Sequence, residues 1–235
     1  MKYAKRREKM IETLQKLKGG LIVSCQALKS EPLYSSHIMA KMAYAAEEGG
    51  AVGIRANTPE DILEIKKEVN LPIIGLYKVD YSNSEIYITP TMKEIDALME
   101  VKPDIIALDA TNRIRPDGST IETFFPKVRE KYPDMIFMAD CSSYEDGIRA
   151  EKLGMNLVGT TLCGYTRDTE GVEIPCFPMV KKLADELKIP LIAEGGIWIP
   201  EQLSHVFKCG AYAAVIGTAI TRPREITRRF VSAIV

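Results

Sequence analysis

Several polar residues in this 235-residue sequence directly follow short apolar runs, and their types suit acid–base chemistry. They are Gln26, Arg55, Lys78, Asp109, Asp140, Thr160 with Thr161, Glu194, and Thr218 after Gly217. Lys78 closes the run LPIIGLYK, where a buried ammonium would be costly unless it were paired. At the tip of a strand it can instead point into a cavity. There its pKa can fall far enough for the amine to act as a base.

A second group of residues suits phosphate binding. Gly195 and Gly196 follow Glu194 directly, and Arg222 lies shortly after Gly217 and Thr218. Glycine allows the backbone to approach a ligand closely, and an arginine adds a charge-assisted contact. The alternative interpretation is that these glycines only form tight turns.

The elements that must position these residues form a repeating pattern. Apolar runs, which predict strands, lie at 21–27, 51–56, 71–78, 105–110, 135–142, 157–162, 190–197 and 212–220. Helical patterns lie at 35–48, 58–69, 91–99, 120–132, 143–154, 177–187, 200–210 and from about 224. Strands that alternate with helices predict a parallel sheet, and eight such units in this length match a closed (β/α)8 TIM barrel. An open doubly wound sheet would need a glycine fingerprint after the first strand, which SCQALKSEP lacks.

We expect one domain, with an extra N-terminal helix over residues 1–18 and the barrel over 19–235. Met10, Leu14 and Leu17 have helical spacing, and the basic run at residues 5–7 is interpreted as the solvated face of that helix. In a barrel the carboxyl ends of all strands meet at one mouth, so the polar residues would converge there. Any one of them could be an ordinary loop residue. A ring of so many charges, however, is costly to assemble for stability alone.

Composition excludes several classes of function. The formal net charge is −1, which argues against a broad nucleic-acid or membrane-binding surface. Five scattered cysteines suggest reduced thiols in a cytosolic protein, and the charged N-terminus is no secretory signal. His37 and His205 lack metal-ligand spacing, so no metal site is expected.

The ordered motifs of the chain resemble one known family. They are GLIVSCQAL, EPLYSS, GAVGIRAN, LPIIGLYK, ITPTMKEID, IALDAT, MADCSS, GTTLCGYT, IAEGGI and GTAITRPREIT, and the likeness covers roughly residues 19–232. The sequence is similar to the N-acylglucosamine-6-phosphate 2-epimerases, also called N-acetylmannosamine-6-phosphate 2-epimerases. The resemblance implies a barrel enzyme of the bacterial cytoplasm that acts in sialic acid breakdown. Its expected reaction converts N-acetylmannosamine 6-phosphate to N-acetylglucosamine 6-phosphate, in a homodimer and without a cofactor.

The resemblance also implies roles for individual residues. Lys78 would be the catalytic acid/base and Glu194 a second catalytic carboxylate. The residues expected around the sugar are Gln26, Arg55 and Asp140, and those expected at the phosphate are Gly195, Gly196, Gly217, Thr218 and Arg222. Two positions depart from the family's pattern. Val79 follows Lys78 where a basic residue is expected, and Thr218 stands where glycine is expected.

The residues do not decide whether one acid/base group or two move the proton. They also leave two other functions open. A strand-end lysine can form a Schiff base, as in an aldolase acting on a sugar phosphate. The same fold could also serve as a non-catalytic sugar-phosphate sensor, since a fold does not fix a function.

Overall fold

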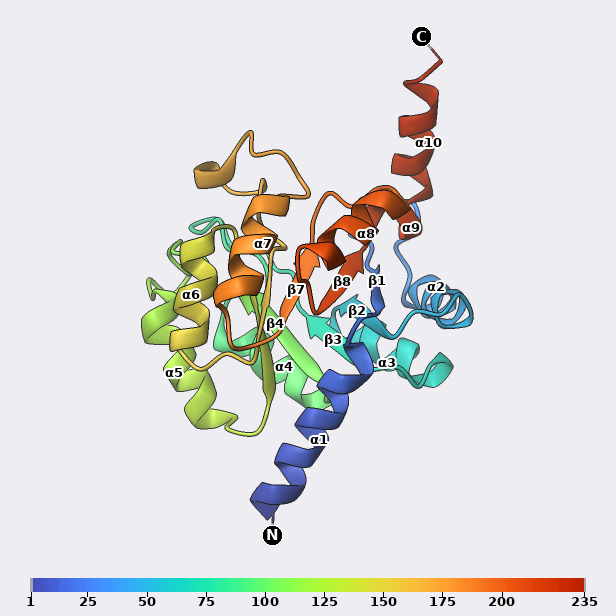
Figure 1. Ribbon diagram of the computed structural model, residues 1–235. Coiled ribbons are helices and arrows are strands. Elements are labelled where there is room, and N and C mark those ends of the chain that lie inside the picture. The colour runs from blue at the N-terminus through green and yellow to red at the C-terminus, as the bar shows by residue number, and fades with distance from the viewer. Residues whose placement is uncertain (1, 235) are drawn as a thin grey trace.

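A computed structural model describes the backbone of residues 2–234 and the side chains of residues 8–234. Eight parallel strands follow one another in chain order around a closed barrel, with β8 paired to β1 (Figure 1). They are β1 (Leu21–Cys25), β2 (Gly53–Asn57), β3 (Ile73–Leu76), β4 (Ile105–Asp109), β5 (Ile136–Asp140), β6 (Leu157–Gly159), β7 (Leu191–Glu194) and β8 (Ala213–Ile216). The predicted (β/α)8 barrel is therefore confirmed.

The helices connect consecutive strands, precede β1 or follow β8. They are α1 (Lys2–Leu17), α2 (Ser36–Glu48), α3 (Pro59–Glu68), α4 (Met92–Val101), α5 (Ile121–Lys131), α6 (Tyr144–Lys152), α7 (Phe177–Glu186), α8 (Pro200–Lys208), α9 (Thr218–Thr221) and α10 (Pro223–Val231). The predicted helix starts are confirmed where a cap defines them. The side chains of Thr58, Thr91 and Ser143 each accept a backbone N–H of the first helical turn.

The strands are shorter than predicted, and this changes the setting of two site residues. β3 ends at Leu76, so Lys78 lies beyond the strand, where it forms an isolated antiparallel bridge with Ile88 of its own loop. β8 ends at Ile216, and Thr218 begins the short helix α9 instead of continuing the strand. The apolar runs overran the strands because loop residues are buried as well. Leu162, for example, is only 1% exposed.

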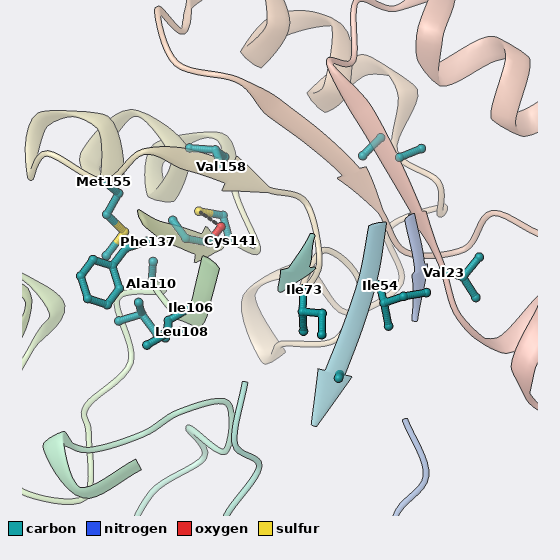
Figure 2. Close-up of a cluster of buried hydrophobic side chains, with 14 of the residues drawn as sticks. Val23, Ile54, Ile73, Ile106, Leu108, Ala110, Phe137, Cys141, Met155 and Val158 are labelled. Carbon is teal, nitrogen blue, oxygen red and sulfur yellow. Dashed lines mark hydrogen bonds between the residues drawn. The ribbon is translucent and has the colours of Figure 1, made fainter. Parts of the chain in front are cut away.

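Alternation along the strands separates an inner core from an outer one. Figure 2 shows part of the outer core, where Val23, Ile54, Ile73, Ile106 and Phe137 are among the buried side chains. The inner core includes Ile22, Ile74, Ile105, Ile136, Met138, Leu157, Ile192 and Val215. Asp140 is two residues beyond Met138, and Glu194 is two beyond Ile192. Their side chains therefore share the inner face, at the carboxyl end of the barrel.

Helix α1 lies at the opposite end of the barrel. Leu17 is fully buried in the inner core, and the Tyr212 hydroxyl donates to the Leu14 carbonyl at 2.9 Å. The basic side chains at 5–7, predicted to be solvated, lie outside the described residues. Within residues 2–234, no helix has both the length and the apolar composition needed to cross a membrane.

Helix α10 follows β8 and extends away from the barrel (Figure 1). The helix predicted from about residue 224 is present, but none of its residues is buried, and Phe230 is 72% exposed. Its apolar side chains are therefore not packed on the barrel core.

Candidate active site

A cavity of about 220 Å³ lies at the carboxyl ends of the strands. Its walls include Gln26, Arg55, Lys78, Glu194, Gly195, Gly196, Gly217, Thr218 and Arg222. Of the residues to which the resemblance assigned roles, only Asp140 is absent from the wall, because it is fully buried and paired with Arg55. The barrel thus brings together residues that are almost 200 positions apart in the sequence.

Arg55 and Asp140 form a buried bidentate ion pair at the base of the cavity. The Arg55 Nη1 donates to Asp140 Oδ1 at 3.0 Å and its Nη2 donates to Oδ2 at 2.5 Å. Burial alone would lower the pKa of Arg55, but the carboxylates of Asp140 and Glu194 outweigh it and raise that pKa. The guanidinium is therefore a fixed positive charge, held in the planar geometry that a carboxylate matches.

Glu194 lies between this ion pair and the cavity. Its Oε2 is 3.0 Å from Arg55 Nη1, and its side chain is 14% exposed. Burial raises the pKa of Glu194; Arg55 opposes that change and Asp140 adds to it. The Thr160 hydroxyl fixes the backbone, since it donates to the Glu194 carbonyl at 2.8 Å and accepts the Glu194 N–H at 3.0 Å. The backbone that carries this carboxyl group is thus fixed, and the pKa of the group lies above its ordinary value.

Lys78 is the second titratable group on the cavity wall. Its backbone N–H donates to Asn57 Oδ1 at 2.8 Å, which ties the loop after β3 to the end of β2. Burial, together with the cations Arg55 and Arg222, lowers the pKa of Lys78 from 10.5 to about 8. Within the described residues no carboxylate lies within ion-pair distance of Nζ. The amine therefore changes its charge near neutral pH, as an acid/base group must.

The glycines and Arg222 form another part of the wall. Gly196 has a φ of +72°, and a Cβ at this position would lie 2.7 Å from Ile174, so only glycine fits. The Arg222 Nε lies 2.8 Å from Glu31 Oε1, and its Nη1 donates to the Thr218 hydroxyl at 3.4 Å. Glu31 thus orients Arg222, a relationship that sequence reasoning did not find.

Gln26 is buried beside the cavity, and only the nitrogen of its side-chain amide is hydrogen-bonded. Its Nε2 donates to the Ser24 hydroxyl at 2.9 Å, whereas no donor within the described residues reaches its Oε1. A buried acceptor without a donor is costly. A hydroxyl or amide of a ligand in the cavity would satisfy it.

The cavity wall also contains residues to which the resemblance assigned no role. They are Ser24, Tyr87, Ile88, Thr161, Tyr165, Ile197, Trp198, Val215, Ile216 and Thr221. Thr161 had a signal, because it directly follows an apolar run. Tyr87 had no such signal in the sequence. It lies beside the cavity because its neighbour Ile88 forms a β-bridge with Lys78.

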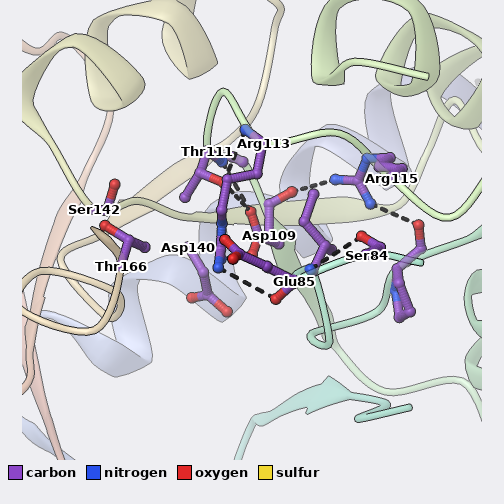
Figure 3. Close-up of polar contacts among 12 residues, drawn as sticks. Ser84, Glu85, Asp109, Thr111, Arg113, Arg115, Asp140, Ser142 and Thr166 are labelled. Carbon is purple, nitrogen blue, oxygen red and sulfur yellow. Dashed lines mark hydrogen bonds and ion pairs between the residues drawn. The ribbon is translucent and has the colours of Figure 1, made fainter. Parts of the chain in front are cut away.

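Other candidates from the sequence lie elsewhere. Asp109 ends β4 but pairs with Arg113 outside the cavity wall (Figure 3). His37 and His205 are exposed, and Cys141 is buried with its thiol pKa raised well above the ordinary value by burial. Among the side chains that the structure describes, at residues 8–234, no three of His, Cys, Asp or Glu are arranged to hold a metal ion.

The fold and the cavity define a class: a (β/α)8 barrel with a charged cavity at the carboxyl ends of its strands. A family model described as "Putative N-acetylmannosamine-6-phosphate epimerase" matches residues 39–235. The chain belongs to this family, as its resemblance to these epimerases predicted.

Individual relatives agree with that assignment. A protein of Caldanaerobacter subterraneus subsp. tengcongensis, named "Putative N-acetylmannosamine-6-phosphate 2-epimerase", is 55% identical over 222 residues, covering 94% of each chain. One of the same name from Clostridioides difficile is 50% identical and covers 94% of this chain and 98% of its own. The solved N-acetylmannosamine-6-phosphate 2-epimerase from Clostridium perfringens has a TM-score of 0.89 at 50% identity, covering 94% of this chain and 95% of its own.

Proposed function

We propose that this protein interconverts N-acetylmannosamine 6-phosphate and N-acetylglucosamine 6-phosphate by inverting C2, without a cofactor. The observation that carries the proposal is Lys78, whose pKa is lowered to about 8 on a cavity wall it shares with Arg55 and Glu194. The names of the relatives give the substrate class, a phosphorylated N-acylated amino sugar.

The proposed chemistry begins with the open-chain sugar, in which C2 carries a proton next to the C1 aldehyde. The neutral amine of Lys78 takes this proton, and the electrons of the C–H bond move to the aldehyde oxygen to form an enolate. Return of a proton to the other face of C2 gives the epimer. A positioned base of this kind contributes roughly 10²–10⁴-fold to a rate.

Arg55 supplies the positive charge that the enolate needs, and its pairing with Asp140 keeps the guanidinium in place. Glu194 either assists ring opening or acts as the second acid/base. The variant Glu194→Gln separates these roles: a second base is needed only for inversion, so C2 exchange would continue while inversion stops. If Glu194 acts in ring opening, exchange and inversion would fall together.

The remaining residues fit the sugar and the phosphate. Gln26 offers its unpaired Oε1 to a sugar hydroxyl or to the N-acyl N–H. The phosphate lies against Gly195, Gly196, Gly217, Thr218 and Arg222, where the backbone can approach closely and one cation is held. Val79 and Thr218, the two departures from the family's pattern, remove none of these groups.

The wider setting follows the resemblance and is likewise a proposal. The enzyme acts in the cytoplasm as a homodimer, in sialic acid breakdown, with residues 1–18 and 19–235 forming one domain. No broad nucleic-acid or membrane surface is involved, consistent with a formal net charge of −1.

The decisive experiment is proton NMR of N-acetylmannosamine 6-phosphate with the purified protein in D₂O. We expect the signals of the epimer to appear and deuterium to enter at C2. If neither occurs, the proposal is wrong. Borohydride reduction with substrate present should leave Lys78 unmodified, whereas a trapped lysine adduct would indicate the aldolase. Tight binding without turnover would indicate the sensor.

A further inference from the structure

One hydroxyl lies between the two carboxyl groups of the cavity. The Thr161 Oγ1 is 2.7 Å from Asp140 Oδ1 and 3.0 Å from Glu194 Oε2. Thr161 follows β6 by two residues and is itself part of the cavity wall. Both carboxyl groups also contact Arg55 Nη1, at 3.0 Å each.

A threonine hydroxyl carries one proton, so it can donate to only one of these carboxyl groups at a time. When the Thr161 hydroxyl donates to Asp140, the lone pairs of its oxygen point toward Glu194. That contact is then attractive if Glu194 carries a proton and donates it. When Glu194 is ionised, the hydroxyl can turn and donate to Glu194, because Asp140 keeps its two bonds from Arg55. The direction of one hydroxyl is therefore linked to the protonation of Glu194.

The surrounding chain is shaped to hold this hydroxyl. A Cβ on Gly159 would lie 3.0 Å from Thr161 Oγ1 and 2.3 Å from the Met138 side chain, so a larger residue would displace the threonine or the core. The neighbouring Thr160 fixes the Glu194 backbone from the same loop. Two consecutive threonines thus hold both the main chain and the side chain of Glu194.

Charged groups reach Glu194 from several elements. Arg55 on β2 and Lys78 after β3 favour its ionised form, and Asp140 on β5 opposes it. Tyr165, in the same loop as Thr161, has a pKa that burial and then Glu194 raise. Thr161 is the neutral partner in this set, and its bond favours the ionised carboxylate.

We propose that Thr161 is a positioning residue, whose hydroxyl holds the carboxyl of Glu194 beside Asp140 and turns as Glu194 gains or loses a proton. This inference rests on the proposed function, since positioning matters only if Glu194 takes part in the reaction. It adds to that function a residue that touches both carboxylates and supplies no charge of its own.

The test compares Thr161→Val, which keeps the shape and loses the hydroxyl, with Thr161→Ser, which keeps it. Thr166→Val is the matched control, because Thr166 is a buried, hydrogen-bonded threonine of the same loop that does not line the cavity. We expect kcat to fall about tenfold in Thr161→Val, with KM changed less than about threefold, as for loss of one bond to a charged group. The serine and control variants should stay within about threefold of wild type.

A second readout reports on Glu194 directly. Carbon-13 NMR of protein labelled at the glutamate carboxyl carbon gives its titration midpoint, with the signal of Glu194 identified by its absence in Glu194→Gln. Loss of a donor to the ionised form should raise that midpoint by about one pH unit in Thr161→Val and leave it unchanged in Thr166→Val. Should the valine variant fail to fold, Thr161→Ala is measured with the same expectation.

An unchanged midpoint or an unchanged kcat in Thr161→Val overturns the inference while wild-type epimerisation stands. Equal losses in Thr161→Val and Thr166→Val, or failure of serine to restore activity, overturn it as well. If the wild type neither epimerises nor exchanges C2, the proposed function fails and the inference fails with it.

Discussion

Two charged clusters stand side by side at the carboxyl end of the barrel. The open cluster consists of Arg55, Lys78, Asp140, Thr161 and Glu194, and the closed cluster of Asp109, Thr111, Arg113 and Arg115. They begin at paired positions, because Asp109 of β4 is the register partner of Asp140 of β5. Both contain buried charge, yet only the open cluster contributes side chains to the cavity wall.

The closed cluster pairs its carboxylate internally, and its second arginine binds backbone carbonyls. Asp109 Oδ1 accepts the Thr111 N–H at 3.0 Å and the Thr111 hydroxyl at 2.7 Å, and Oδ2 accepts Arg113 Nη2 at 2.5 Å. Arg115 donates to the backbone carbonyl of Asp109 (Figure 3), and also to those of Thr89 and Pro90. It therefore fastens the loop that carries Lys78 to the loop after β4.

The open cluster, by contrast, leaves its titratable groups available. Arg55 and Asp140 satisfy each other, while Lys78 has no carboxylate within ion-pair distance among the described residues. The comparison teaches that charge at a strand end does not by itself mark chemistry. What separates the two clusters is whether a titratable group keeps unused hydrogen-bonding capacity toward a cavity.

The largest expected effect comes from Lys78→Met. We expect kcat to fall at least about a thousandfold, because the substitution removes the proposed base. The variant should be no less stable than wild type at pH 7, since the folded state lowers the pKa of this amine and so disfavours its charge. That cost is fully present below about pH 8 and disappears as the pH rises past about 10.4, the unfolded value. Rate assays and thermal melts at several pH values check both expectations.

The pH profile of the wild type tests the open cluster without a mutation. If neutral Lys78 is the base, kcat/KM should rise about tenfold per pH unit well below its pKa of about 8 and level off near it, hence roughly fiftyfold between pH 6 and 8. A profile that is flat over this range would contradict the assignment of Lys78. Circular dichroism across the same range serves as the control for folding.

Asp109→Asn should lower stability and largely retain activity, whereas Lys78→Met should lose activity and retain stability. Loss of the bonds to Arg113 and Thr111 is expected to lower the free energy of unfolding by about 2 kcal/mol. At a temperature where the variant is folded, kcat should remain within about tenfold of wild type. Urea unfolding followed by assays measures both quantities. A large loss of activity at unchanged stability would place Asp109 among the functional groups and break the comparison.

The smallest expected effect is that of Arg222→Ala. KM should rise about tenfold through loss of a charge-assisted contact to phosphate, with a smaller change in kcat. Removal of this cation should also move the midpoint of the Lys78 profile to higher pH, because Arg222 lowers the pKa of Lys78. Initial-rate measurements against pH test both effects. Arg228→Ala is a suitable control, since Arg228 is an exposed arginine of α10 that does not line the cavity.

Much of the fold could be predicted because its signals are local. The helical patterns predicted from residues 58, 91 and 143 start at the capping residues Thr58, Thr91 and Ser143, and apolar runs marked all eight strands. Strand ends could not be predicted equally well. A strand ends where its hydrogen bonding to the adjacent strand ends. The apolar pattern, by contrast, continues into buried loop residues such as Leu162.

The sequence could predict only those site residues that follow a strand directly, because the carboxyl ends of the strands meet at the barrel mouth. Gln26, Arg55 and Glu194 close apolar runs, and all three line the cavity. Asp109 has the same signal and lies outside the wall. Tyr87 has no such signal and lies on it.

The sequence by itself determined the order of the elements, the family and the residue types available for chemistry, because these depend on local pattern and composition. Only the tertiary structure decided which of those residues meet. It paired Arg55 with Asp140, oriented Arg222 through Glu31 and placed Thr161 between two carboxyl groups. The physical reason is that burial and the distances between side chains set pKa values and charge pairing, and both arise only when the barrel closes.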